Sequence, residues 1–213
     1  MIEHAFILLL AIPLVSAPIL YLIGRIHTKL SPEKTSTNPV RWAALLVMLL
    51  TWVPFITAIQ QFLQNGTIIL TYGTISLHLD GLSLVLSGAA LTLATIVVLF
   101  SGPYISGEEG EEKYYALLNI LMSTMIGLSC AADLFNLWVW FETMAIASFF
   151  LVTFNKEQST ALEAGMKYLV QSAAGSVLVL LGISLVFGTT GSLDLATLSQ
   201  KMGASVPVLL LAG

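Results

Sequence analysis

The 213-residue chain is 57% hydrophobic and 9% charged, and its formal net charge is −4. Because about 25% of the residues in a typical soluble domain are charged, this composition excludes an ordinary water-soluble domain and indicates a polytopic membrane protein. The negative charge gives no basis for binding nucleic acid. Cys130 is the single cysteine, which excludes an internal disulfide or a Cys-ligated metal site, and we expect no cofactor and no metal in this chain.

Six apolar segments are long enough to cross a bilayer, which takes about 20 helical residues. In chain order they are expected at residues 4–25, 41–63, 80–101, 114–132, 133–154 and 161–187. The first segment is too long for the apolar part of a signal peptide and no basic residue precedes it, so we interpret it as a retained transmembrane helix. The predicted fold class is therefore all-α, a polytopic transmembrane helical bundle.

A seventh helix is predicted to begin near Ser205. Only eight or nine apolar residues follow, and at 1.5 Å per residue they cannot cross a bilayer of about 30 Å. We therefore expect six complete helices plus the start of a seventh. The chain is then either a fragment or one whose last helix is completed by another polypeptide.

The connection between the second and third helices has the composition of strands. Residues 67–79 are rich in β-branched side chains, and Gly73 separates two short runs. This pattern predicts a small extracytoplasmic hairpin. Asp80 follows it where the N-cap of the next helix is expected.

The basic residues predict the orientation in the membrane. Those of the first, third and fifth connections are Arg25, Lys29, Lys34, Arg41, Lys113 and Lys156. Because cytoplasmic loops carry the excess of Lys and Arg, these three connections are expected in the cytoplasm and the N-terminus outside.

Glu142 is the most informative residue, because it lies near the middle of the fifth predicted helix. A charge at this depth costs roughly 2.5–3.5 kcal/mol on insertion scales, and such residues usually have a partner and a task. One interpretation is a carboxylic acid hydrogen-bonded between helices. The favoured interpretation is a titrating proton carrier, because burial and a nearby cation act on a carboxyl pKa in opposite directions.

Lys167, near the start of the sixth predicted helix, is the candidate cation. It is closer to the cytoplasmic surface than Glu142 by about seven residues, or about 10 Å along the axis, so direct contact is not expected. A snorkelling anchor is the alternative role. Glu163 lies four residues before Lys167, an order that favours an ion pair. We interpret Glu163 mainly as neutralising Lys167, and secondly as the cytoplasmic entry to a relay.

Two further groups in these helices are interpreted as packing residues. Trp138 and Trp140 have the character of aromatic packing or interfacial side chains. The sixth predicted helix carries a cluster of small residues that close helix packing explains: Ser172, Ala173, Ala174, Gly175, Ser176 and Gly182.

Several motifs together resemble a known family. They are Asp80-Gly81-Leu82-Ser83, Lys113-Tyr114-Tyr115, Asp133 to Glu142, Glu163-Ala164-Gly165-Met166-Lys167-Tyr168 and Gly191-Ser192-Leu193-Asp194-Leu195. The chain is similar to the antiporter-like membrane subunits of respiratory complex I, over roughly residues 80–200. The superfamily includes Mrp-type antiporter subunits and membrane-bound hydrogenase subunits.

The resemblance implies roles and a domain organisation. Glu142 matches the family's proton-channel acid, and Lys167 matches the lysine that opens the next helix. Residues 1–79 would form the N-terminal helices and hairpin, and residues 80–213 the first part of the proton-channel half. The family's principal pumping lysine lies on a later helix, beyond residue 213.

The implied function is a proton-translocating membrane subunit of a complex I-type NADH:quinone oxidoreductase, which itself carries no redox cofactor. Its partners would be other membrane subunits, the lipid bilayer and protons or sodium ions, in an energy-transducing membrane such as a bacterial inner membrane. An Mrp-type cation/proton antiporter subunit and a non-pumping structural subunit are the alternatives.

Overall fold

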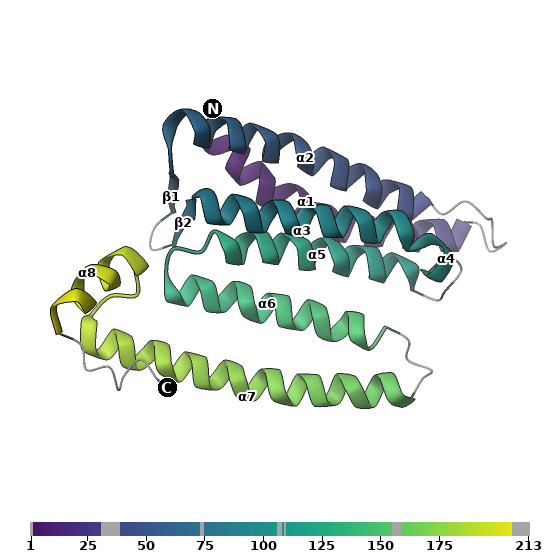
Figure 1. Cartoon of the computed structure of the whole chain (residues 1–213). Helices are drawn as coiled ribbons and strands as arrows, with labels where there is room; N and C mark the ends of the chain where they lie inside the picture. The colour runs from purple at the N-terminus through teal and green to yellow at the C-terminus, as the bar shows by residue number, and fades with distance from the viewer. Residues whose placement is uncertain are drawn as a thin grey trace.

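The computed structural model describes residues 2–30, 39–72, 75–105, 108, 110–154 and 159–205. Long helices run side by side, and a two-stranded hairpin lies at the end that also holds the N-terminus (Figure 1). The elements are α1 (Ile2–Leu30), α2 (Pro39–Asn65), β1 (Ile68–Tyr72), β2 (Ile75–Leu79), α3 (Gly81–Phe100), α4 (Gly102–Ile105), α5 (Glu111–Ser129), α6 (Leu134–Val152), α7 (Ser159–Thr190) and α8 (Leu195–Ser205).

The predicted transmembrane helical bundle is confirmed. Five helices are long and apolar enough to cross a membrane by length and composition: α1, α2, α3, α6 and α7. The helix predicted at residues 114–132 is present as α5, which is 19 residues long and lies among the others (Figure 1), but its composition does not place it among the five candidate spans. Its lower hydropathy follows from Glu111, Glu112 and Lys113 in the first turn and from Asn119 in the middle.

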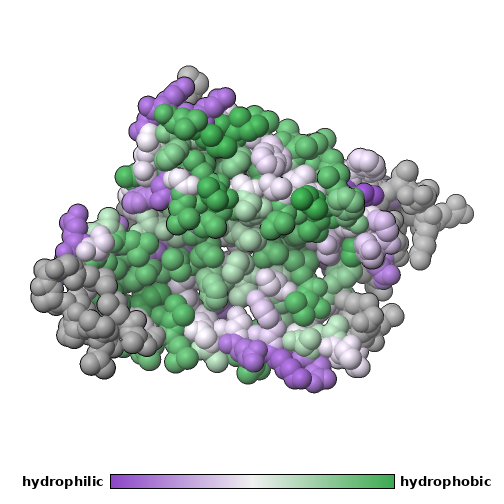
Figure 2. All heavy atoms as spheres, in the orientation of Figure 1, coloured by the Kyte–Doolittle hydropathy of each residue, from purple (hydrophilic) through white to green (hydrophobic). Residues whose placement is uncertain are grey.

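Hydrophobic side chains cover most of the visible face between the two ends of the bundle (Figure 2). This is the surface expected of helices that face lipid, where exposed apolar side chains carry no penalty. The chain is an integral membrane protein.

The packed centre of the bundle is built around α5. α5 lies against α1, α3 and α6, and its fully buried Tyr115, Met122 and Ile126 belong to the main cluster of buried apolar residues. Close approach depends on small residues, because a Cβ at Gly127 would overlap the indole of Trp140 on α6. Inside a membrane, helices associate mainly through van der Waals contacts, and small residues at the interface allow the backbones to approach closely enough to make them.

Three connections are joined by backbone hydrogen bonds at the hairpin end. β1 and β2 pair antiparallel, with Ile68 opposite Leu79. The His78 N–H donates to the Cys130 carbonyl at 2.8 Å, which places the α5–α6 junction beside β2. Leu134 N–H donates to the Leu193 carbonyl at 3.0 Å, which adds the α7–α8 connection. The start of α6 and the end of α7 are therefore held at the same edge.

Polar side chains mark the helix ends. The predicted N-cap is confirmed, because the Asp80 carboxylate accepts from the Ser83 N–H at 2.8 Å and the Ser83 hydroxyl closes the capping box. Asp133 caps α6 in the same way by accepting from the Asn136 N–H at 2.7 Å. Arg41 donates to the Leu99 carbonyl at 2.6 Å and so satisfies the end of α3.

Asp194 holds the start of α8 through two hydrogen bonds. Its Oδ1 accepts from the Thr197 N–H at 2.7 Å and from the Thr197 hydroxyl at 2.6 Å. These two donors lower the pKa of the Asp194 carboxyl below its ordinary value. Asp194 therefore caps α8 most strongly when its carboxyl group is ionised.

Two short helices in the structure were not predicted from the sequence, and the predicted seventh helix lies almost entirely outside the described residues. The short helices α4 and α8 interrupt connections that the sequence predicted as loops. The seventh helix predicted near Ser205 falls almost entirely on residues 206–213, which lie outside the described residues. The helix ends that flank the three connections predicted to be cytoplasmic lie at one end of the bundle (Figure 1), and the side of the membrane that this end faces stays a prediction.

Candidate functional site

Glu142 lies near the middle of α6 and is partly buried against α7. It forms a hydrogen bond with Ser176 of α7, whose hydroxyl donates to Glu142 Oε2. Ser176 itself is only 4% exposed, so water cannot replace this donor easily. Glu142 therefore has the hydrogen-bond partner that its depth in the membrane led us to expect. That partner is Ser176, which the sequence analysis interpreted only as a packing residue.

Trp138 completes the hydrogen-bonded group. Its indole Nε1 donates to Ser176 Oγ at 2.8 Å. Because tryptophan can only donate, the Ser176 hydroxyl accepts from Trp138 and directs its own hydrogen to Glu142. In this chain of hydrogen bonds Trp138 donates to Ser176 and Ser176 donates to Glu142, which holds Glu142 Oε2 in place.

This group cannot itself conduct a proton. The indole N–H of Trp138 does not release its proton near neutral pH. Trp138 therefore cannot pass a proton to Ser176. Ser176 and Trp138 instead hold Glu142 Oε2 in place through hydrogen bonds.

Lys167 lies on a different face of α7 from Ser176. The two residues are nine apart, which is two and a half turns at 3.6 residues per turn, so their side chains point in opposite directions. Lys167 Nζ instead pairs with Glu163 Oε1 at 2.6 Å, and these side chains are 71% and 66% exposed. The chain therefore does not bring Lys167 and Glu142 together, as the predicted offset implied.

The depth of this ion pair follows from the same spacing. Nine residues correspond to about 13 Å along α7, whereas half the hydrocarbon core is about 15 Å. If Ser176 and Glu142 lie at the membrane centre, Lys167 lies near its edge. The predicted i,i+4 pairing of Glu163 and Lys167 is present, and it suits both an anchor and the mouth of a proton path.

The Ser176 and Trp138 contacts could have been recognised only in part from sequence. Trp138 is four residues before Glu142, so the two share a face of α6. That spacing would have placed the indole beside the carboxylate. Nothing in the local pattern of α7 distinguishes Ser176 from Ser172, because the choice depends on how α7 is rotated against α6.

Among the described residues, no group of three or more His, Cys, Asp or Glu side chains could hold a metal ion. The site consists of one carboxyl group and two neutral donors. Such an arrangement can bind and release a proton.

The fold and the partly buried carboxyl group define the chain as a membrane helical bundle, and comparisons with known proteins show what it is similar to. Residues 131–212 match the family described as NADH:quinone oxidoreductase/Mrp antiporter, TM. NADH-quinone oxidoreductase subunit N of Desulfitobacterium hafniense is 36% identical over 112 residues, which are 52% of this chain and 23% of the relative. F(420)H(2) dehydrogenase subunit N of Methanosarcina mazei is 32% identical over 111 residues, which are 52% of this chain and 22% of the relative.

A solved structure extends the similarity to nearly all of the chain. It is described as the membrane-bound sulfane sulfur reductase, an archaeal respiratory membrane complex, and one of its chains matches with a TM-score of 0.79 and 27% identity. The match covers 92% of this chain and 39% of that chain. The predicted resemblance is confirmed, and the chain is related to the antiporter-like membrane subunits. It spans about a quarter of the length of the curated relatives named above.

Proposed function

We propose that the chain is part of a proton-translocating membrane subunit of a complex I-type oxidoreductase, and that Glu142 carries the proton. The single observation that supports this role is the Ser176 hydrogen bond to Glu142, in the middle of a membrane-crossing helix. The same hydrogen bond would also suit a carboxyl group that only joins α6 and α7, so the proposal depends on whether Glu142 must change its protonation state. A fixed donor leaves one carboxylate oxygen in a constant position to take up and release a proton.

Lys167 and Glu163 are proposed as the outer part of the same relay. Their ion pair lies about 13 Å from the depth of Glu142, so water or further residues would have to connect them. In this proposal Glu163 receives protons at the membrane edge, and Lys167 changes the local charge when it moves toward or away from Glu163. The exposure of both side chains supports contact with solvent or with another subunit.

The remaining parts of the proposal concern the assembly. The chain would work with other membrane subunits, and redox cofactors would belong to separate subunits. The N-terminus would face away from the cytoplasm, because Arg25 lies near the end of α1, Arg41 near the start of α2 and Lys113 in the first turn of α5. The membrane would be energy-transducing, such as a bacterial inner membrane.

An Mrp-type cation/proton antiporter subunit is the second candidate. The observation that favours it is the family description, which covers NADH:quinone oxidoreductases and Mrp antiporters together. Co-purifying subunits distinguish the two candidates, because flavin and iron–sulfur proteins belong with the first, and only small membrane proteins with the second.

The decisive experiment is Glu142→Gln in inverted membrane vesicles that contain the assembled complex. Gln keeps the shape and a hydrogen-bond acceptor for Ser176, but it cannot bind and release a proton near neutral pH. We expect most proton translocation to be lost while the complex still assembles. Glu108→Gln is the matched control, since Glu108 is exposed outside the helices and its replacement should leave translocation unchanged.

Normal translocation by an assembled Glu142→Gln complex would end the carrier role. Lys167→Ala gives a separate measure of the outer pair. A changed ratio of protons moved to electrons transferred would support the relay, whereas an effect on protein abundance alone would make Lys167 an anchor.

A further inference from the structure

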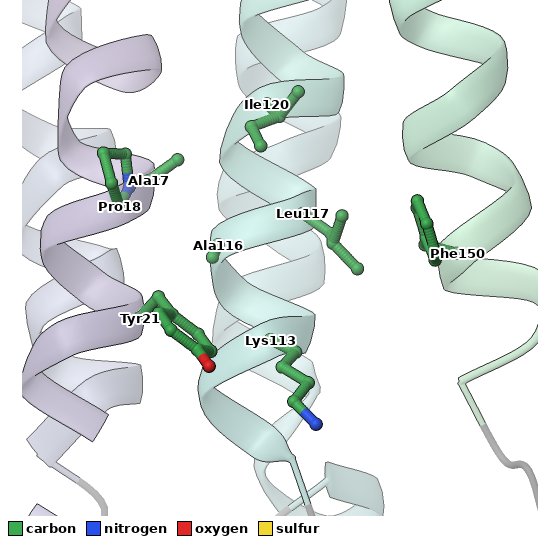
Figure 3. Close-up of a pocket in the computed structure, with 8 residues that line it drawn as sticks. All are labelled: Ala17, Pro18, Tyr21, Lys113, Ala116, Leu117, Ile120 and Phe150. Atoms are coloured by element: carbon green, nitrogen blue, oxygen red, sulfur yellow. The ribbon is translucent and has the colours of Figure 1, made fainter. Parts of the chain in front are cut away.

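A groove lies between α1, α5 and α6, and Glu142 is not among the residues that line it. Its volume is about 380 Å³, within the range of roughly 300–1,000 Å³ for ligand sites. Ala17 and Ala116, both buried, line it where α1 approaches α5, and Phe150 lines it from α6 (Figure 3). Small side chains on two helices and a large one on the third leave a hollow instead of close packing.

The polar atoms of the groove are confined to one end. Figure 3 shows the Tyr21 hydroxyl and the Lys113 amine at the same end, with Leu117 and Ile120 further along α5. From Lys113 to Ile120 the groove follows α5 for seven residues, or about 10 Å. An occupant must therefore be amphipathic, with a polar head beside Lys113 and an apolar chain directed toward Ile120.

The charge of the head follows from Lys113. No ion pair or hydrogen bond of the Lys113 amine is found within the described part of the chain. Its neighbours Glu111 and Glu112 are two residues and one residue away on α5, and residues at these spacings do not face each other on a helix. Arg25 adds a second positive charge, because it is exposed one turn beyond Tyr21 on the same face of α1.

The depth of Lys113 matches a lipid headgroup. Lys113 is in the first turn of α5, where a membrane helix meets the interface. A basic residue beside a cleft between transmembrane helices is the kind of site that anionic phospholipid headgroups occupy. A neutral head, such as that of a quinone, would leave the amine without a negative partner.

We infer that this groove binds one anionic phospholipid, with an acyl chain between α1, α5 and α6 and the phosphate beside Lys113. The lipid fills the hollow and supplies the negative charge that Lys113 lacks. It would also cover the contact of α1 with α5, the helix at the centre of the bundle. This inference does not depend on the role of Glu142.

The test uses the full chain in vesicles of equal parts phosphatidylglycerol and phosphatidylcholine. After extraction in mild detergent, native mass spectrometry identifies the phospholipid that stays bound. We expect one phosphatidylglycerol in preference to phosphatidylcholine. Since a basic residue near the membrane surface is worth about 1 kcal/mol, Lys113→Gln should reduce this preference about fivefold, and Lys113→Arg should keep most of it.

Two further variants separate the head from the chain. Lys201→Gln is the matched control for a lost positive charge, because Lys201 binds the Thr190 carbonyl at the opposite end of the bundle, and it should leave retention unchanged. Ala116→Leu fills the groove while Lys113 remains, and it should remove the retained lipid. Equal retention of both lipids, an unchanged preference in Lys113→Gln, or full retention in Ala116→Leu would each overturn the inference.

Discussion

Gly165 of α7 lies directly against Thr153 at the end of α6, so that a Cβ at position 165 would overlap the Thr153 Cγ2 atom. The Thr153 side chain is held in place by a hydrogen bond to the Phe149 carbonyl at 2.9 Å. This contact sets the spacing of the two helices that carry Glu142 and Ser176. Gly165→Ala should therefore push α6 and α7 apart and destabilise the protein by about 1–3 kcal/mol.

Gly175→Ala is the matched control, because nothing lies within 4 Å of a Cβ at that position of the same helix. Alanine there should be neutral or stabilise the helix by up to about 1 kcal/mol, since it has the higher helix propensity. Thermal unfolding in detergent, followed by tryptophan fluorescence, measures both variants. Equal stability of the two would mean that the close approach at Gly165 is not needed.

Ser176→Ala tests whether the hydrogen bond orients Glu142. Hydrogen bonds to charged groups contribute about 1.5–3 kcal/mol, so we expect proton translocation by the assembled complex to fall about tenfold or more. Ser176→Thr keeps the hydroxyl and should restore the rate, which a purely structural defect at this position would not allow.

Trp138→Phe gives an intermediate case. It removes the donor to Ser176 but leaves the serine hydroxyl free to contact Glu142, so translocation should fall less than in Ser176→Ala. A larger loss in Trp138→Phe than in Ser176→Ala would contradict the proposed order of donors.

The transmembrane helices were predictable because each is a long apolar run. α6 was expected at residues 133–154 and is found at Leu134–Val152. Strand propensities and Gly73 likewise predicted the hairpin found as β1 and β2. These features depend on local composition, which is read directly from the chain.

The partner of Glu142 was not predictable, because it depends on the rotation of one helix against another. In contrast, the separation of Lys167 from Glu142 followed from residue counting along antiparallel helices. α8 was missed for another reason: it has 11 residues and weak hydrophobicity, and its position depends on Asp194 pairing with Asp133 across the junction. Long-range pairing of this kind leaves no local periodic pattern.

Asp133→Ala should weaken the start of α6. Asp133 is 9% exposed, and its Oδ1 accepts from the Asn136 N–H, which otherwise has no partner in the helix. Loss of an N-cap of this kind costs about 0.5–2 kcal/mol, which unfolding in detergent can measure. Asp133→Asn keeps the cap and should cost little. Similar losses in the two variants would show that the charge of Asp133, and not its capping oxygen, is what matters.

The N-cap of α8 should depend on pH through Asp194. Hydrogen bonds from Thr197 lower the pKa of this carboxyl, so the unfolded state binds its proton at a higher pH than the folded state. The stabilisation is therefore complete above the ordinary Asp pKa of about 3.9 and is lost as the pH falls through the lowered folded value. Asp194→Asn should remove this acid-dependent part of the stability of α8.

Thr197→Val isolates the side-chain donor, which is the largest cause of the lowered pKa. The Thr197 N–H still donates to Asp194 in this variant, so the carboxyl pKa should rise toward its ordinary value without reaching it. Thr197→Ser keeps a hydroxyl and should leave the pKa low. Carboxyl-carbon NMR of isotopically labelled aspartate in micelles measures the titration, and an identical midpoint in Thr197→Val and the unaltered chain would show that the hydroxyl does not bind the carboxylate.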